Sequence, residues 1–176
     1  MTGLVAMLGP DDFLTRPKLW WRAYTASIVQ HAASVAERLG LRSRVTEVDQ
    51  ADSQFAETPG IVLVDPWLAT AHGSDVLASR LRDLPPWVVP VVLEEPPDAI
   101  GAQPAIVQEA VTALRNAAAG RVESVHSMVQ LDRILPAVVA KARRTYLRQL
   151  QITHVPEATK RPPRLRDAQW RLEEDS

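Results

Sequence analysis

The sequence predicts a three-layer α/β protein in which helices flank a parallel sheet of five strands. Residues 61–64 are isoleucine, valine or leucine and Asp65 follows them, as expected for a strand that is buried on both faces. Apolar residues recur every three or four positions over residues 18–39, which indicates an amphipathic helix. Strand-like and helix-like stretches then alternate along the chain, and this alternation favours a parallel sheet with helices on both faces.

Two strands and one long helix are predicted before the central strand. Residues 3–8 form an apolar run that fits either a first central strand or an apolar leader packed beside the domain. The helix over 18–39 ends at Gly40, because glycine adopts the left-handed conformation that commonly terminates a helix. Polar and apolar side chains alternate over residues 44–48, which is typical of an edge strand with one buried face.

Prolines mark the element boundaries that follow the central strand. A helix begins near Ser74 and ends before Pro85 and Pro86, since a helix does not continue through two prolines. Residues 87–93 predict a second buried strand. Pro90 lies inside this strand and donates no ladder hydrogen bond, so we expect a bulge there.

The remaining elements complete the alternation. Residues 104–119 predict a helix closed by Gly120, and residues 121–125 predict the last edge strand. A final apolar stripe runs over residues 128–150, but Pro136 interrupts it. Either the helix kinks there, or a short turn ends and a new helix begins with Pro136 in its first turn, which we favour. Five strands in this pattern favour the flavodoxin-like strand order 2-1-3-4-5.

The chain is expected to form one domain over residues 1–150, followed by a tail over residues 151–176. The domain length of about 150 residues is enough to bury a single core. The tail contains three prolines and many charged residues, with arginine and lysine prominent. We therefore expect a basic, proline-containing, flexible and disordered tail.

Composition and charge exclude several classes of protein. The net charge is −1, so no global field directs the chain to nucleic acid or to an anionic membrane. The absence of cysteine excludes disulfides, thiolate nucleophiles and thiolate metal sites. No apolar run approaches the roughly 18 residues of a membrane span, and Asp11 and Asp12 precede the first basic residue, unlike in a signal peptide. The sequence thus predicts a cytoplasmic protein without a membrane partner.

Acidic side chains follow several of the predicted strands. Because the carboxyl ends of parallel strands meet at one edge of a sheet, we expect these acids to form a candidate ligand edge. Its members are Asp11, Asp12, Asp65, Glu94 and Glu95.

This pattern invites comparison with a response-regulator receiver, in which an aspartate in the place of Asp65 accepts a phosphoryl group beside magnesium. The fourth strand, however, ends in Glu94 and Glu95 rather than in serine or threonine, and no lysine follows the fifth strand. A magnesium site also needs oxygen ligands in near-octahedral placement. The alternative, which we favour, is that Asp65 caps the next turn by accepting a hydrogen bond from its own backbone.

Other catalytic patterns are absent from the sequence. A hydrolase of the TIR type requires a glutamate soon after this strand, and residues 67–81 contain none. No glycine-rich phosphate loop is present, and the four histidines are too widely spaced in sequence to suggest a metal pair. We therefore predict no catalytic residue, no metal and no cofactor.

Basic residues gather towards the C-terminus of the chain. Within this run, Arg143, Arg144 and Arg148 are candidate partner-binding residues, which could contact an acidic protein or nucleic acid. The alternative is the solvated face of the last helix. Nucleic acid is the less favoured partner, because no aromatic residues alternate with the basic ones.

Three motifs, taken in order, resemble the C-terminal half of the TIR-like FxsC proteins of actinobacteria, which are encoded beside FxSxx-COOH peptides and their radical-SAM maturase. The motifs are GIVLVDPW at residues 60–67, PWVVPVV at residues 86–92, and LPAVV at residues 135–139, the last followed by ARRTYLR and PPRLR. The resemblance covers roughly residues 20–166 and implies a TIR-like α/β fold and a peptide or maturase as partner. It carries over no catalytic residue, and the TIR-like domain that usually precedes this region is not part of this sequence.

Two functions from different classes follow as hypotheses. The first is a non-catalytic TIR-like accessory or interaction module of a peptide-modification (FxSxx-COOH) or signalling system. The alternative is a receiver-like phosphoacceptor or a TIR-type nucleotide hydrolase centred on Asp65. Burial of Asp65 among other acids would favour the alternative, whereas a simple turn cap favours the interaction module.

Overall fold

A computed structural model describes residues 2–9, 19–45, 57–96, 103–118 and 120–153 of the chain. The chain divides into two compact units, Met1–Tyr146 and Leu147–Ser176. The first unit contains the sheet and the helices that cover it. In the second unit, only the C-terminal turns of the last helix are described, and most of the predicted tail over residues 151–176 lies outside the described residues.

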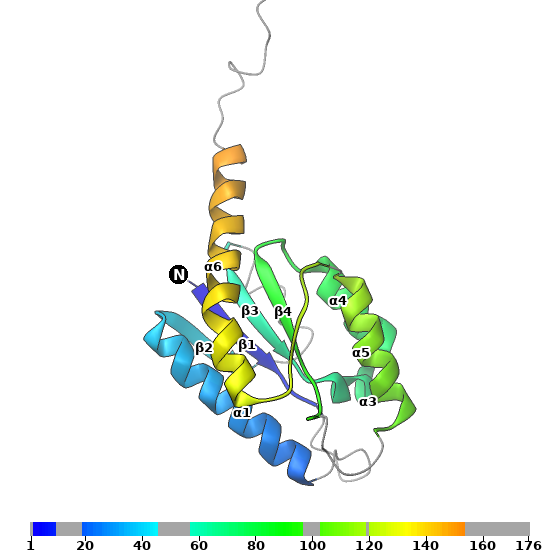
Figure 1. The fold of residues 1–176 in the computed structure, drawn as a ribbon. Helices are drawn as coiled ribbons and strands as arrows, with labels where there is room; N and C mark the ends of the chain where they lie inside the picture. Colours follow the sequence, from blue (N-terminus) through cyan, green and yellow to red (C-terminus); the bar gives the residue numbers. More distant parts are fainter. Residues whose placement is uncertain (1, 10–18, 46–56, 97–102, 119, 154–176) are drawn as a thin grey trace, which may run out of the picture. The chain divides into compact units, whose positions relative to one another are not determined.

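The first unit is built on a five-stranded, entirely parallel sheet (Figure 1). Its strands follow the order β2-β1-β3-β4-β5, which confirms the predicted flavodoxin-like order. The strands are β1 (Thr2–Met7), β2 (Leu41–Val45), β3 (Gly60–Val64), β4 (Val88–Leu93) and β5 (Glu123–Val125). The first apolar run of the chain is therefore a central strand, paired with β2 on one side and β3 on the other.

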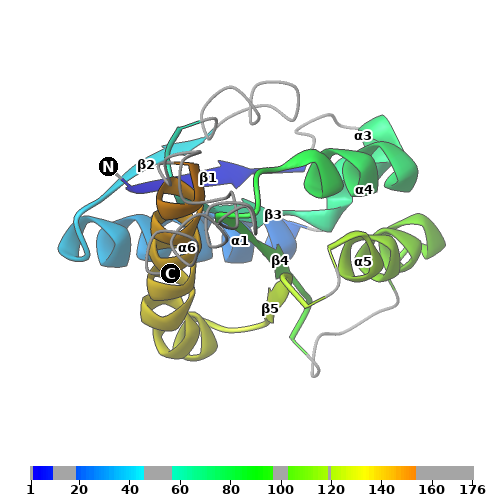
Figure 2. The same cartoon turned by 90° about the horizontal axis from the view of Figure 1, so that it is seen from above.

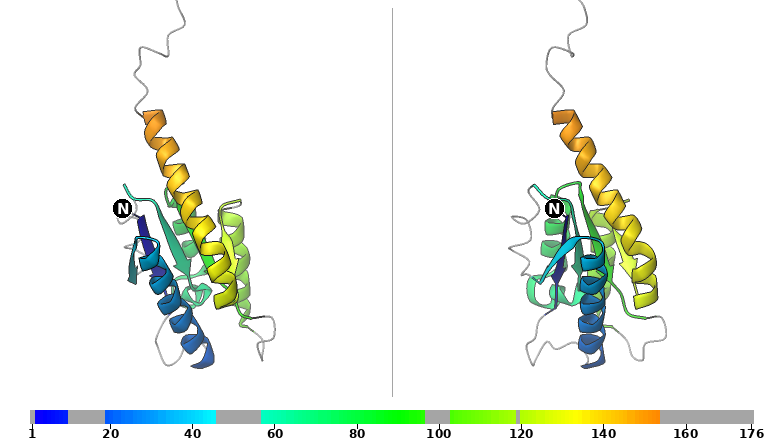
Figure 3. Two further views of the ribbon diagram at one scale, coloured as in Figure 1. Left: turned by 60° about the vertical axis from the view of Figure 1, so that its left-hand side comes forward. Right: turned by 90° about the vertical axis from the view of Figure 1, so that its left-hand side faces the viewer.

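Helices cover both faces of this sheet, as Figure 2 shows. One face carries α1 (Leu19–Arg38) and the first-unit part of α6 (Met128–Thr153), which lie side by side in Figures 1 and 3. The other face carries α4 (Ser74–Asp83) and α5 (Ala105–Ala117). Two short elements connect β3 to α4, the 3-10 helix η2 (Pro66–Leu68) and the single turn α3 (Ala69–His72).

The core follows directly from the alternation of side chains along the strands. In β3, Ile61 and Leu63 pack against α1 and α6, whereas Val62 and Val64 pack against α4 and α5. All four side chains are fully buried. A strand buried on both faces needs apolar residues at every position, which explains why this run lacks the polar alternation of an edge strand.

The predicted bulge at Pro90 is wrong. Residues of β3 and β4 pair one to one through this position, with Val62 opposite Pro90. The N–H of Glu94 donates to the carbonyl of Val125 in β5, so the even-numbered residues of β4 direct their backbone groups towards β5. Because β5 pairs only with residues from Val91 onward, the Pro90 nitrogen lies beyond the end of β5 and no ladder hydrogen bond is lost.

The predicted break at Pro136 is also wrong, because α6 runs without interruption through this residue. Pro136 is exposed, whereas Leu135 and Val138 beside it are buried in the core. Continuing the helix keeps the apolar stripe on the sheet, and this burial outweighs the hydrogen bond that proline cannot donate. Ser127 accepts a hydrogen bond from the backbone N–H of Gln130 (3.2 Å) and so caps the start of the helix.

The edge strand β2 begins earlier than predicted, at Leu41, and residues 46–48 of the predicted range lie outside the described residues. It follows immediately on Gly40, whose φ of 72° confirms the predicted left-handed helix end. Among the described helices, none combines the length and the apolar character that crossing a membrane requires.

Candidate functional site

Asp65 lies at the carboxyl edge of the sheet, where the connections that follow the strands begin. It follows β3 directly and is the N-cap residue of η2. Only 2% of its surface is exposed, and it is the only acidic residue among the buried residues of the described chain. A buried carboxylate is costly unless hydrogen bonds or charges compensate it, so its contacts decide its role.

Three donors from three parts of the chain compensate this carboxylate. The backbone N–H of Trp67 donates to Oδ1 over 3.0 Å, which confirms the predicted turn cap. The indole Nε1–H of Trp21, on α1, donates to the same oxygen over 3.2 Å. The backbone N–H of Gly9, just beyond β1, donates to Oδ2 over 2.9 Å. We call these four residues, Gly9, Trp21, Asp65 and Trp67, the Asp65 junction.

Gly9 fits the Asp65 junction because it has no side chain. A Cβ added at this position would lie 2.8 Å from Asp65 Oδ2 and 2.8 Å from the Cβ of Trp67. Both distances are shorter than real Cβ contacts, so any other residue would push the loop after β1 away from the carboxylate. The close approach of this backbone to Asp65 therefore requires glycine.

Burial raises the pKa of Asp65 above its ordinary value, and the hydrogen bonds from Trp67, Gly9 and Trp21 oppose that rise. No charged group contributes to the shift. The junction thus differs from an acidic cluster, in which neighbouring carboxylates raise one another's pKa. Its carboxylate contacts the chain's own donors instead of an open cleft.

Glu94, at the end of β4, is paired differently. Its Oε1 accepts a hydrogen bond from Arg115 Nη2 on α5, and its Oε2 lies 3.7 Å from His126 Nδ1. Its side chain is 15% exposed, whereas Arg115 is largely in solvent. The charge of Glu94 is therefore neutralised within the protein, by a basic residue on the neighbouring helix.

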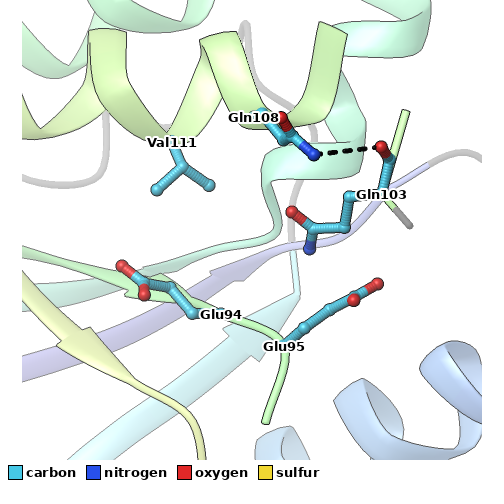
Figure 4. Close-up of a pocket in the computed structure, with 5 residues that line it drawn as sticks. All are labelled: Glu94, Glu95, Gln103, Gln108 and Val111. Carbon is cyan, nitrogen blue, oxygen red and sulfur yellow. Dashed lines mark hydrogen bonds between the residues drawn. The ribbon is translucent and has the colours of Figure 1, made fainter. Parts of the chain in front are cut away.

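Glu95 lies beside a pocket of about 350 Å³ at the same edge of the sheet. The pocket is lined by Glu94, Glu95, Gln103, Gln108 and Val111, and we call it the Glu95 pocket (Figure 4). The side-chain amide of Gln108 donates to the backbone carbonyl of Gln103 over 3.2 Å and closes one side of it. One carboxylate oxygen of Glu95, Oε1, is buried and has no hydrogen-bond partner within the described structure.

The two glutamates do not converge on a common point. In Figure 4, the carboxylates of Glu94 and Glu95 point in different directions, one towards Val111 and the other beneath Gln103. Across the described ranges, no group of three or more histidine, aspartate or glutamate side chains is placed to hold a metal ion. Of the other acids predicted at this edge, Asp11 and Asp12 lie outside the described residues.

The predicted partner-binding arginines lie on α6, and one of them makes hydrogen bonds within the first unit. Arg143 donates from Nε to Thr2 Oγ1 over 2.9 Å and from Nη2 to the carbonyl of Leu39 over 3.1 Å, so it joins α6 to β1 and to the end of α1. Arg144 is exposed on the same helix. Arg148 belongs to the second unit. Arg143 thus has a structural contact that the charge pattern did not reveal.

Sequence reasoning missed Arg121, which closes the end of α4. Its guanidinium donates to the backbone carbonyls of Leu81, Leu84 and Pro85 over 2.8–3.0 Å. Burial lowers the pKa of Arg121 from its ordinary value. The available signal was the helix end at residues 84–86, where two prolines leave carbonyl groups without helical donors.

No protein-family model matches this chain, and neither a curated protein nor a solved structure matches it. The resemblance of three motifs to FxsC proteins therefore remains a prediction from the sequence.

Proposed function

We propose that this chain is a non-catalytic, TIR-like accessory or interaction module that binds a protein or peptide partner. By the resemblance of its motifs, the partner is an FxSxx-COOH peptide or its radical-SAM maturase, and the module acts in the cytoplasm. A signalling system with a peptide partner of the same kind is the broader form of the proposal. In either form, the chain contributes a binding surface and performs no chemistry.

The observation that supports the proposal is that both carboxylate oxygens of Asp65 already accept hydrogen bonds from the protein. A phosphoacceptor needs a carboxylate oxygen that reaches solvent, a metal and an incoming phosphoryl group. Both oxygens of Asp65 instead receive hydrogen bonds from Gly9, Trp21 and Trp67, and its side chain is buried. Phosphorylation would have to break these bonds and open the core, which weighs against the receiver-like and hydrolase alternatives.

The proposal is tested with purified components. The chain is titrated, by isothermal calorimetry, with an FxSxx-COOH precursor peptide and separately with its maturase. We expect saturable binding of at least one of them, and absence of binding to both would overturn the assignment of the partner.

The catalytic alternative has its own test. The chain is incubated with acetyl phosphate and magnesium, and in a second reaction with NAD. We expect neither a phosphorylated peptide containing Asp65 by mass spectrometry nor release of nicotinamide. Phosphorylation at Asp65, abolished in Asp65→Asn, would contradict the non-catalytic proposal, as would nicotinamide release.

A further inference from the structure

We propose that the Glu95 pocket binds a cationic side chain, the guanidinium of an arginine or the ammonium of a lysine, presented by the partner. The inference deepens the proposed function, because it names the chemical group that the partner contributes. Only the source of the cation, a residue of the partner, depends on the proposed function. The pocket itself can be tested on the isolated chain.

The charges around the pocket determine the sign of its ligand. Arg115 neutralises Glu94 by direct contact, so Glu94 adds no uncompensated charge. Glu95 has no basic partner among the ion pairs of the described chain, and its Oε1 receives no hydrogen bond. Within the described part of the chain, the pocket therefore holds one unpaired negative charge, and a group that carries a positive charge complements it.

The polar atoms around the pocket favour an organic cation over a metal ion. Glu95 is the one free carboxylate, and Glu94 points away from it (Figure 4). A metal ion would need several converging oxygen ligands, whereas a guanidinium or ammonium needs hydrogen-bond acceptors on one side and tolerates apolar contact on the other. Gln103 and Gln108 supply side-chain amides at the rim, and Val111 supplies apolar surface for the alkyl chain.

The carboxylate of Glu95 is the acceptor for such a ligand. Its Oε1 is buried and accepts no hydrogen bond within the described structure, so no internal donor at this oxygen compensates the carboxylate. A cationic donor in the pocket adds a hydrogen bond to this carboxylate that the free protein lacks. Charged hydrogen bonds of this kind are stronger than neutral ones.

The volume of the pocket fits a side chain better than a larger ligand. A pocket of about 350 Å³ lies at the small end of the range for ligand sites. It accommodates the end of one arginine or lysine and leaves the rest of a peptide on the surface.

The test uses agmatine, which is decarboxylated arginine and carries a guanidinium and a primary ammonium, and 1-butanol as an uncharged probe. Binding is followed through the NMR resonances of the side-chain amides of Gln103 and Gln108. We expect saturable shifts with agmatine and none with butanol. In Glu95→Gln we expect the affinity for agmatine to fall about tenfold, since one charge-assisted hydrogen bond contributes on that order.

Two matched variants control this result. Glu109→Gln removes an exposed acid of α5 that does not line the pocket, and should leave agmatine binding unchanged. Arg115→Gln removes the cation that neutralises Glu94 and should raise the affinity. Equal losses in Glu95→Gln and Glu109→Gln, or no saturable shift with agmatine, would overturn the assignment of the pocket.

A peptide distinguishes the source of the cation. Acetyl-Ala-Ala-Arg-Ala-Ala-amide should bind the pocket more tightly than agmatine if the ligand is a side chain of a partner. Tighter binding of agmatine would overturn that source. Agmatine binding that persists while neither the precursor peptide nor the maturase binds would contradict the proposed partner and leave the pocket assignment standing.

Discussion

The Asp65 junction and the Glu95 pocket occupy the same edge of one sheet, and both begin with an acid at the end of a buried strand. At Asp65, three donors from separate parts of the chain fill the oxygens, and the side chain is buried. At Glu95, one oxygen has no partner within the described structure, and a pocket lies beside it. An acid at a strand end is therefore not a site in itself. The donors that surround it determine whether it holds the fold together or binds a ligand.

The largest expected effect comes from removing the carboxylate of the Asp65 junction. Asp65→Ala leaves two buried donors and one partly buried donor without acceptors, and we expect the free energy of unfolding to fall by about 3 kcal/mol. Urea denaturation followed by tryptophan fluorescence measures this loss. A loss below about 0.5 kcal/mol, which is typical of surface positions, would show that the junction contributes nothing to stability.

The next effect comes from the glycine of the same junction. In Gly9→Ala, the new Cβ would lie 2.8 Å from both Asp65 Oδ2 and Trp67 Cβ. We expect a loss of about 2 kcal/mol, within the usual range for overpacking. Because part of the clash is with the carboxylate, the loss should be smaller in an Asp65→Ala background, and a double-mutant cycle measures this coupling. Additive losses would contradict the close contact.

Arg121 tests whether a second, partly buried polar contact stabilises the fold as the Asp65 junction does. In Arg121→Lys, a single ammonium replaces the planar group that donates to Leu81, Leu84 and Pro85. We expect a loss of about 1 kcal/mol in thermal or urea unfolding, in line with the loss of a helix-capping contact. The matched change Arg133→Lys, at an exposed position on α6, should be neutral. Equal effects of the two changes would exclude a specific cap.

Tyr24 packs beside Trp21 of the Asp65 junction, with ring centroids 5.4 Å apart. Its phenol is a second titratable group in this region, next to the carboxyl of Asp65 in the sense that both contact Trp21. Burial raises the pKa of Tyr24 from 10.0 to about 12. The folded state thus holds the phenol proton more tightly than the unfolded state. Its contribution to stability is complete below pH 10.0 and is lost as the pH rises through about 12.

The chain contains two tyrosines, so Tyr146→Phe leaves Tyr24 as the only one. Absorbance at 295 nm in this variant should titrate with a midpoint near 12. A midpoint near 10.0 would contradict the burial of the hydroxyl.

The smallest expected effect lies in the Glu95 pocket. Glu95→Gln removes a charge without removing an internal hydrogen bond from Oε1. We expect the free energy of unfolding to change by less than about 0.5 kcal/mol, as at most surface positions. Urea unfolding of this variant beside Asp65→Ala measures the comparison directly. A loss as large as that of Asp65→Ala would make Glu95 a structural residue.

The sequence predicted the fold largely because its signals are local. Apolar runs, the glycine at residue 40 and the alternation of strands and helices were enough to predict five parallel strands in the observed order. The turn cap at Asp65 was predictable for the same reason, since Trp67 is two residues away. Gly9 and Trp21 were not, because 56 and 44 residues separate them from Asp65.

The errors at the two prolines have a related cause. The effect of a proline depends on what lies opposite its nitrogen and on which face of the helix it occupies. For Pro90, the relevant fact is where β5 ends, and for Pro136 it is the continued burial of the apolar stripe. The apolar stripe across Pro136 was visible in the sequence and its burial was underestimated, whereas the end of β5 is not encoded near Pro90. The pairing of Glu94 with Arg115 on α5 was hidden in the same way.

The order of synthesis gives the Asp65 junction one further consequence. Its members, Gly9, Trp21, Asp65 and Trp67, all precede α4 and Arg121 in the sequence. A nascent chain that ends shortly after Trp67 already holds every donor for the carboxylate, so β1, α1 and β3 can associate early. The end of α4, by contrast, must wait for Arg121. The Asp65 junction can therefore form earlier in synthesis than the cap of α4.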